Sequence, residues 1–189
     1  YRLQKVSNVE GMKGFIINPL SSKNKFYFKF SLNIYMINYE ESEIILSWIN
    51  DSKNYSINLQ ITLNAISYCL KYNSKLIFIS SASTQLLNNN YAISKFISEI
   101  ICKYYSKSNL NYNILRVFNV YGDNQSIFFL IPKLLLDIKK NKKIIVNNIN
   151  AKRDYIYIDD VCEAIYKSIF VKKKNITLDI GTGKSYSVK

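Results

Sequence analysis

The chain has 189 residues, of which 48% are hydrophobic. That is enough apolar material to bury one core, so we expect a single domain over residues 1–189. The chain contains no histidine, which argues against zinc sites and against Ser-His-Asp hydrolysis. No apolar run approaches the roughly 20 residues of a membrane span, so we expect no membrane partner.

The net charge of +13 comes from lysines spread along the whole chain, with one tight cluster at Lys172–Lys174. Nucleic-acid binders concentrate Arg and Lys on one face beside a reading element, and the sequence shows no such element. Heavy use of Asn, Lys, Ile and Tyr is the pattern that an AT-rich genome imposes. We therefore attribute the charge to composition and expect no nucleic-acid partner, although a positive field would attract a nucleotide diphosphate.

The cysteines Cys69, Cys102 and Cys162 lie in apolar helical stretches without Cys-x-x-Cys spacing. This pattern favours buried free thiols in a reducing compartment over disulfides or metal sites. We therefore expect a cytoplasmic protein without a metal ion.

Apolar runs alternate with helical periods from residue 75 onward. The segment 75–83 reads as a buried strand, because four consecutive apolar residues lead into small hydroxyl residues, and 91–105 has apolar residues at helical spacing. Strands alternating with helices predict an α/β fold with a parallel sheet and crossover helices. The further elements that we expect are a strand over 111–121, a helix over 126–140, a short strand over 143–146, a strand-like segment over 154–158, a helix over 161–170 and a strand over 176–180.

Tyr91 and Lys95 lie four residues apart on the expected helix, which puts both side chains on one face, one turn apart. A phenol has an ordinary pKa of about 10, and a nearby ammonium favours the phenolate, which draws that pKa toward neutrality. A hydroxyl from Ser81, at the end of the preceding strand, could share the proton transfer and hold a substrate oxygen. The same spacing also arises by chance on a surface helix of a chain rich in Tyr and Lys.

A series of segments supports the catalytic interpretation. In chain order they are N-L-Q-I-T-L-N at 58–64, I-S-S-A-S at 79–83, Y-A-I-S-K at 91–95 followed by Glu99, L-R-V-F-N-V-Y-G at 115–122, R-D-Y-I-Y-I-D-D-V at 153–161 and D-I-G-T-G at 179–183. Together they resemble the extended short-chain dehydrogenase/reductases, specifically the NAD-dependent epimerase/dehydratase family that acts on nucleotide sugars. The resemblance implies a Rossmann-like parallel sheet with flanking helices.

The resemblance also implies roles for single residues. Tyr91 exchanges a proton with a sugar hydroxyl, Lys95 lowers the pKa of the phenol and binds the nicotinamide ribose, and Ser81 orients the reacting oxygen. Further cofactor contacts are implied for Asn58, Ser80 and Val120.

Two residues are implied on the substrate side, Asn119 facing the sugar nucleotide and Arg153 reaching its diphosphate. A salt bridge from Arg153 to Asp159 or Asp160 is the alternative. We expect Arg116 to be structural, and Asp154 and Asp160 to cap the helix that begins near Val161.

The N-terminus departs from the family pattern. The glycine-rich loop that cradles a cofactor pyrophosphate at a helix N-terminus is not convincingly present. Gly11-Met12-Lys13-Gly14-Phe15-Ile16 resembles it faintly, but Ile17 occupies the place of a third glycine and Pro19 falls inside the would-be helix. This segment is either a degenerate loop or a coincidence in a divergent or truncated N-terminus, and we expect weak or absent dinucleotide binding by residues 1–189.

Two further departures concern the catalytic connection and the C-terminus. The connection from Ser81 to Tyr91 is shorter than in most relatives, as in some sugar-nucleotide reductases and epimerases of surface-polysaccharide pathways. The chain begins on Tyr1 and stops at Lys189, where the family continues into a substrate-binding region, so we expect a fragment that is incomplete at both ends.

The function that we expect is that of a nucleotide-sugar epimerase, dehydratase or reductase, with NAD or NADP as cofactor. The substrate partner would be a nucleotide sugar, and a homodimer is one expected assembly. The alternative is a non-catalytic fragment or pseudoenzyme of the same fold without dinucleotide binding. The shared catalytic residues do not choose among epimerase, dehydratase, reductase and decarboxylase.

Overall fold

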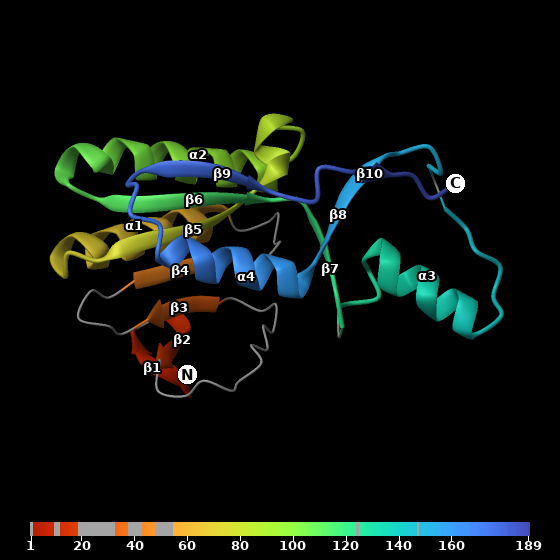
Figure 1. Ribbon diagram of the computed structural model, residues 1–189, viewed down its shortest axis with the longest axis horizontal. Helices are drawn as coiled ribbons and strands as arrows, with labels where there is room; N and C mark the ends of the chain where they lie inside the picture. The colour runs from red at the N-terminus through yellow and green to blue at the C-terminus, as the bar shows by residue number, and fades with distance from the viewer. Residues whose placement is uncertain are drawn as a thin grey trace.

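The computed structural model describes residues 2–9, 12–18, 33–37, 43–47, 55–123, 125–146 and 148–189, with side chains described from residue 59 onward. The described part forms a main sheet with helices on its faces and a small second sheet at one end (Figure 1).

The main sheet has seven strands in the order β1-β2-β3-β4-β5-β6-β9. The strands β4, β5, β6 and β9 are parallel to one another, whereas β1 with β2 and β3 with β4 are antiparallel. The predicted Rossmann-like parallel sheet is confirmed in the half of the sheet that carries the predicted motifs. The bounds are β1 Arg2–Val9, β2 Met12–Asn18, β3 Asn33–Ile37, β4 Glu43–Ser47, β5 Lys75–Ser81, β6 Asn111–Val117 and β9 Ile176–Ile180.

The two central strands β5 and β6 are covered on both faces, which explains their continuous apolar runs. The helices α1 (Tyr55–Lys71) and α2 (Asn90–Tyr105) cover one face, and α4 (Ile158–Ile169) covers the other (Figure 1). Alternate residues of β5 divide between the two cores: Leu76 and Phe78 pack with α1 and α2, whereas Ile77 and Ile79 pack with α4.

The start of α2 is fixed by its own sequence. The Asn89 side chain accepts a hydrogen bond from the Ala92 backbone N–H at 2.8 Å and so caps the helix. Tyr91 therefore lies in the first turn, beside the carboxyl ends of the parallel strands. The short helix η1 (Ala82–Gln85) makes the connection from β5 compact.

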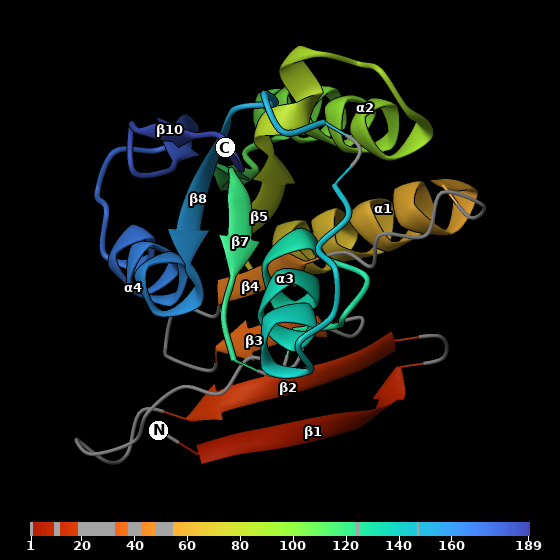
Figure 2. The same ribbon diagram turned by 90° about the vertical axis from the view of Figure 1, so that its right-hand side faces the viewer.

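The predicted strand over 111–121 is two strands in different sheets. β6 ends at Val117, and β7 (Asn119–Tyr121) belongs to a three-stranded sheet with β8 (Arg153–Tyr157) and β10 (Ser185–Tyr186). This second sheet lies at the end of the main sheet, and Figure 2 looks onto it, with β7 and β8 running side by side. The chain thus crosses from the core to the ligand-binding edge within a single residue, Phe118.

Two predicted elements differ from the structure beyond β7. The helix α3 covers Leu130–Lys139 and begins later than expected, because residues 126–129 form a turn in which the Phe129 N–H bonds the Ser126 carbonyl at 3.0 Å. The short strand expected over 143–146 is wrong. That segment is irregular and mostly exposed, and its β-branched residues have no neighbouring strand to pair with.

Of the two N-terminal glycines, only Gly14 is described, and it does not lie at the start of a helix. Gly14 lies inside β2, where it pairs with Val6 of β1 and Ile34 of β3. Gly11 and residues 19–32 lie outside the described residues. Among the residues that the structure describes, no helix is long and apolar enough to cross a membrane.

The central strands should dominate the stability of the fold. Ile114 of β6 is fully buried in the core under α1 and α2, so Ile114→Ala should lower the free energy of unfolding by about 2–5 kcal/mol, measured by urea denaturation. The control is Leu135→Ala on α3, where the side chain is 62% exposed and little change is expected. Equal losses in the two variants would contradict this assignment of the core.

Candidate active site

Ser81, Tyr91 and Lys95 meet at the carboxyl edge of the main sheet. Ser81 is the last residue of β5, and its hydroxyl accepts the Ser83 N–H at 3.2 Å and lies 2.8 Å from the Ser83 hydroxyl. Tyr91 and Lys95 follow one another by one turn of α2, and the Lys95 Nζ lies 5.8 Å from the centre of the Tyr91 ring. The connection through η1 is short enough to return the chain beside the serine.

The Lys95 side chain reaches back along β5. Its ammonium is buried, donates to the Ile79 carbonyl at 2.6 Å and lies 5.1 Å from the centre of the Phe78 ring. Burial lowers the pKa of Lys95 well below its ordinary value, and the negative charge of Glu99 opposes that shift. The backbone carbonyl therefore fixes the direction of the amine while its apolar surroundings weaken its hold on the proton.

The pKa of Tyr91 moves in the opposite direction to the one expected from the sequence. Burial raises the phenol's pKa above its ordinary value, and hydrogen bonding from the Ser81 side chain lowers it by a smaller amount. The expectation that Lys95 draws this pKa toward neutrality is not met, because the same burial disfavours the charged form of both groups. The favoured resting state is a neutral phenol beside a weakly basic lysine.

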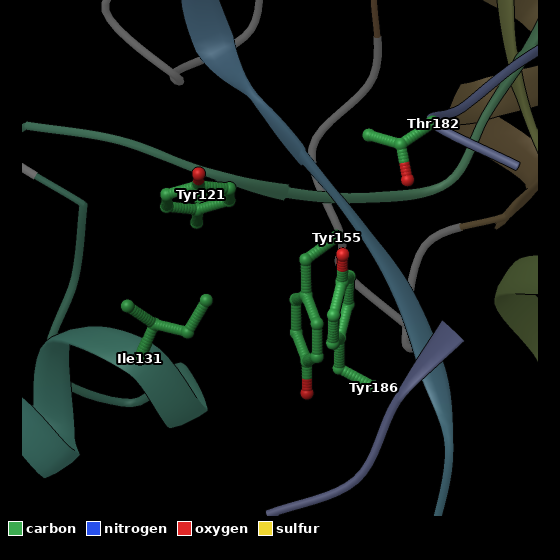
Figure 3. Close-up of a pocket in the computed structure, with 5 residues that line it drawn as sticks. All are labelled: Tyr121, Ile131, Tyr155, Thr182 and Tyr186. Carbon is green, nitrogen blue, oxygen red and sulfur yellow. The ribbon is translucent and has the colours of Figure 1, made fainter. Parts of the chain in front are cut away.

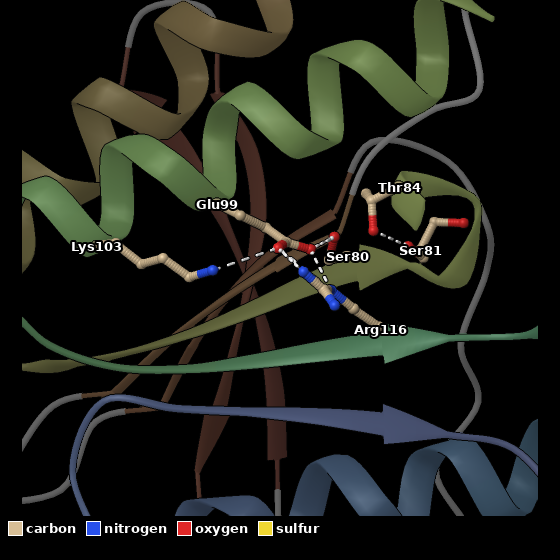
Figure 4. A network of polar contacts seen from close by, with 6 residues as sticks. All are labelled: Ser80, Ser81, Thr84, Glu99, Lys103 and Arg116. Atoms are coloured by element: carbon tan, nitrogen blue, oxygen red, sulfur yellow. Dashed lines mark hydrogen bonds and ion pairs between the residues drawn. The ribbon is translucent and has the colours of Figure 1, made fainter. Parts of the chain in front are cut away.

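A buried carboxylate lies one turn beyond Lys95 (Figure 4). Glu99 is fully buried, and its Oε1 accepts the Ser80 hydroxyl at 2.6 Å. The guanidinium of Arg116 donates to both carboxylate oxygens, with Nη2 to Oε2 at 2.7 Å and Nε to Oε1 at 3.0 Å. Because this hydrogen bonding favours the charged form, the pKa of Arg116 is raised.

These contacts define the roles of Ser80 and Arg116. The Ser80 hydroxyl, for which a cofactor contact was expected, is buried and directed at Glu99. Arg116 is a structural ion-pair partner, as expected. Glu99 follows the Y-A-I-S-K segment in the sequence, but no role was expected for it. Its signal was the one-turn spacing from Lys95 together with an arginine on the neighbouring strand.

The two β7 residues expected at the ligand lie at different depths. Asn119 is exposed, and its Nδ2 donates to the Asp154 carbonyl of β8 at 3.1 Å. Val120 is partly buried and packs against the core under α4. Neither residue contacts Tyr91 or Lys95 through a hydrogen bond in the described structure.

Asp154 was expected to cap a helix, and that expectation is wrong. Its carboxylate instead accepts the Thr182 N–H at 3.0 Å, the Thr182 hydroxyl at 2.7 Å and the Gly183 N–H at 2.8 Å. Burial alone would raise the pKa of Asp154, but these hydrogen bonds produce a net lowering. A methyl group at Gly181 would lie 2.7 Å from this carboxylate, so the close approach of the loop requires glycine.

Arg153 is exposed at the start of β8, where its Nη1 donates to the Lys152 carbonyl at 3.2 Å. Within the described structure it makes no salt bridge to Asp159 or Asp160, so the alternative expected for this residue is not observed. The guanidinium faces an open cavity of about 350 Å³ whose lining also includes Lys133.

A second cavity of about 480 Å³ lies beside the first and shares Tyr155 with it (Figure 3). Tyr121 and Ile131 line one side, and Tyr155 and Tyr186 line the other. Of these, Tyr121 and Tyr155 fall within the segments quoted above, at 115–122 and 153–161. Tyr186 was not expected here, because its place depends on the pairing of β10 with β8.

Three further expectations from the sequence concern Asn58, a metal ion and the cysteines. Asn58 lies on α1, but its side chain is outside the described residues. Among the side chains that are described, no group of three or more His, Cys, Asp or Glu could hold a metal ion. Cys69, Cys102 and Cys162 are buried free thiols, and burial raises the pKa of each to about 12.

Comparison with known proteins decides the family. The model of the NAD dependent epimerase/dehydratase family matches residues 33–181. The chain belongs to this family. Among curated relatives, it is 37% identical over 111 residues to the GDP-6-deoxy-D-talose 4-dehydrogenase of Aggregatibacter actinomycetemcomitans, covering 58% of this chain and 37% of the relative. It is 29% identical over 186 residues to a putative UDP-glucose 4-epimerase of Methanocaldococcus jannaschii. That match covers 80% of this chain and 59% of the relative.

Solved structures of epimerases share the fold. The UDP-N-acetylglucosamine 4-epimerase of Methanobrevibacter ruminantium superimposes with a TM-score of 0.72 at 23% identity, over 77% of this chain and 56% of the other. The UDP-glucuronic acid 4-epimerase of Bacillus cereus, solved with UDP-glucuronic acid and NAD, superimposes with a TM-score of 0.66 at 26% identity. The match covers 75% of this chain and 51% of the other. The chain thus spans between about one third and three fifths of the length of these relatives.

The buried ion pair should be more sensitive to mutation than exposed pairs. Arg116→Met leaves the fully buried Glu99 carboxylate uncompensated and should lower the free energy of unfolding by about 3–5 kcal/mol in urea denaturation. The control is Lys167→Met, which breaks the exposed pair with Glu163 at 2.7 Å and should change stability little. The interpretation fails if Arg116→Met is no more harmful than Lys167→Met.

Proposed function

We propose that this protein is a nucleotide-sugar epimerase, dehydratase or reductase in which Tyr91, Lys95 and Ser81 perform acid–base catalysis beside a nicotinamide cofactor. The observation that carries the proposal is the convergence of a phenol, an amine and a hydroxyl at the carboxyl edge of a parallel sheet. Open α/β sheets bind their ligands at this edge. Membership of the epimerase/dehydratase family supports the same assignment.

The described residues fit one end of a dinucleotide. Lys95 and Tyr91 are the donors that would hold the nicotinamide ribose, with Val120 beside the ring. Held there, a nicotinamide would supply reversible hydride transfer to and from the sugar carbon. Gly14 lies in a strand, so the described residues offer no glycine loop for the pyrophosphate. We therefore propose NAD, which solved relatives contain, as a cofactor that this chain binds weakly.

The raised pKa of Tyr91 determines the direction in which this residue transfers a proton most readily. Because burial raises the pKa of the phenol, Tyr91 is protonated at neutral pH and can donate a proton to a sugar oxygen at once. In the reverse direction the phenolate must form, and it is favoured when the Lys95 amine, whose pKa burial lowers, carries its proton. The Ser81 hydroxyl stabilises the phenolate by hydrogen bonding and orients the sugar oxygen.

The substrate side is proposed from charge and exposure. Arg153 presents an exposed guanidinium, with no ion pair to the described residues, beside an open cavity that Lys133 also lines, which suits a diphosphate. The Asn119 amide would face the sugar from the neighbouring strand. The net charge of +13 would raise the local concentration of such an anion. Reduced thiols at Cys69, Cys102 and Cys162 support a cytoplasmic location.

Tyr91→Phe should separate chemistry from binding. It removes the proton-exchanging group but keeps the ring, so turnover of UDP-glucose, UDP-glucuronic acid or dTDP-glucose at saturating NAD should fall by about 10²–10⁴-fold, with little change in NAD affinity. Lys95→Met should impair both turnover and NAD binding, since the amine serves both. Tyr104→Phe is the control, because that ring on the same helix is 63% exposed.

Steady-state kinetics and calorimetric titration with NAD provide these measurements. Wild-type turnover in the Tyr91→Phe protein would refute the mechanism. A folded wild-type protein that neither binds NAD nor converts any of the three nucleotide sugars would favour the non-catalytic alternative.

A further inference from the structure

Glu99 lies on the face of α2 that carries the proposed catalytic residues. It follows Lys95 by one turn, as Lys95 follows Tyr91. Its carboxylate has no exposed surface, yet it contacts neither Tyr91 nor Ser81. Its hydrogen-bond partners are Ser80 and Arg116, so its contact with the catalytic serine runs through the strands.

The two strand partners are register neighbours. Ser80 of β5 and Arg116 of β6 lie directly opposite each other in the parallel pair. They continue the rows of side chains that face α2, where the preceding members are apolar residues such as Phe78 and Ile114. The carboxylate therefore ties the helix to both strands at the last positions before the site.

The path from Glu99 to the catalytic serine is short. Ser80 precedes Ser81, whose carbonyl accepts the Thr84 hydroxyl at 2.8 Å at the start of the connection to α2 (Figure 4). Resting on the function proposed above, we propose that Glu99 is a positioning residue: its carboxylate, held by Arg116, fixes the Ser80 hydroxyl and with it the turn that presents Ser81 to Tyr91.

The choice of a carboxylate has a second consequence. A carboxylate accepts from Arg116 and Ser80 at once, which an apolar residue of similar volume could not do. Its negative charge also raises the pKa of Lys95 against the effect of burial. Lys103, by contrast, lies 4.0 Å from the carboxylate with a side chain that is 46% exposed, and it has no contact with Ser80. It therefore provides a matched control.

The experiment compares Ser80→Ala, Glu99→Gln and Lys103→Gln in the purified protein. Hydrogen exchange is read by mass spectrometry over residues 82–90, with α4 as internal reference, and kcat and KM are measured for UDP-glucose, UDP-glucuronic acid and dTDP-glucose at saturating NAD. Ser80→Ala leaves the ion pair intact, so it remains informative if Glu99→Gln fails to fold.

We expect faster exchange over residues 82–90 and unchanged exchange over α4 in Ser80→Ala. Its kcat should fall by about 10- to 100-fold with KM nearly unchanged, as expected for a misplaced catalytic group. Lys103→Gln should resemble wild type in all three readouts. A Ser80→Ala protein with wild-type exchange and kcat would overturn the proposal. Glu99 would then stabilise the fold without positioning Ser81. If the wild-type protein turns over none of the three sugars, the proposed function fails, and the exchange over 82–90 alone decides whether Glu99 fixes this turn.

Discussion

The site depends on how α2 lies across β5 and β6, and a single buried carboxylate holds that arrangement. Glu99 is bound by a hydroxyl from one strand and a guanidinium from the next. Taking such a pair out of water costs several kcal/mol, and apolar residues packed there are often as stable. Apolar contacts, unlike hydrogen bonds, do not constrain the relative orientation of the groups that meet. Because hydrogen bonds are directional, those to Glu99 favour the orientation of α2 in which Lys95 donates to the Ile79 carbonyl and Tyr91 lies beside Ser81.

A second carboxylate, that of Asp154, connects chain segments at the end of the main sheet in a similar way. Asp154 binds the loop at Thr182 and Gly183, while its backbone carbonyl accepts from Asn119. One residue of β8 thus joins the ends of the chain segments that surround the cavities.

The part of the fold that the sequence predicts well rests on local patterns. The apolar run ending in Ser80 and Ser81, and the helical spacing after Tyr91, each contain the reason for their structure, because the strand is buried on both faces and the helix on one. The one-turn spacing of Tyr91 and Lys95 likewise predicts a shared face. These features need no information from distant residues, and they account for the parallel core and for the face of α2 that carries Tyr91 and Lys95.

The features that the sequence does not predict depend on distant partners. The apolar run through Phe118 gives no sign that β6 ends there, since the break is made by the pairing of β7 with β8. Residues 143–146 have strand-forming side chains but no strand to pair with. The raised pKa of Tyr91 follows from its burial, which spacing alone does not reveal. The same holds for the Asp154 carboxylate, which binds the distant loop at Thr182 and Gly183 and not the start of the helix that follows β8.

In the proposed mechanism, Tyr91 acts on the hydroxyl group, and a bound nicotinamide on the hydrogen, of one sugar carbon. Rapid mixing of the protein and saturating NAD with UDP-glucose, UDP-glucuronic acid or dTDP-glucose tests it, with the near-ultraviolet absorbance of reduced nicotinamide as the signal. We expect a transient rise in this absorbance with at least one of the three sugars, slowed in the Tyr91→Phe protein. A folded wild-type protein that produces no reduced nicotinamide with any of them, at any NAD concentration, would contradict the account.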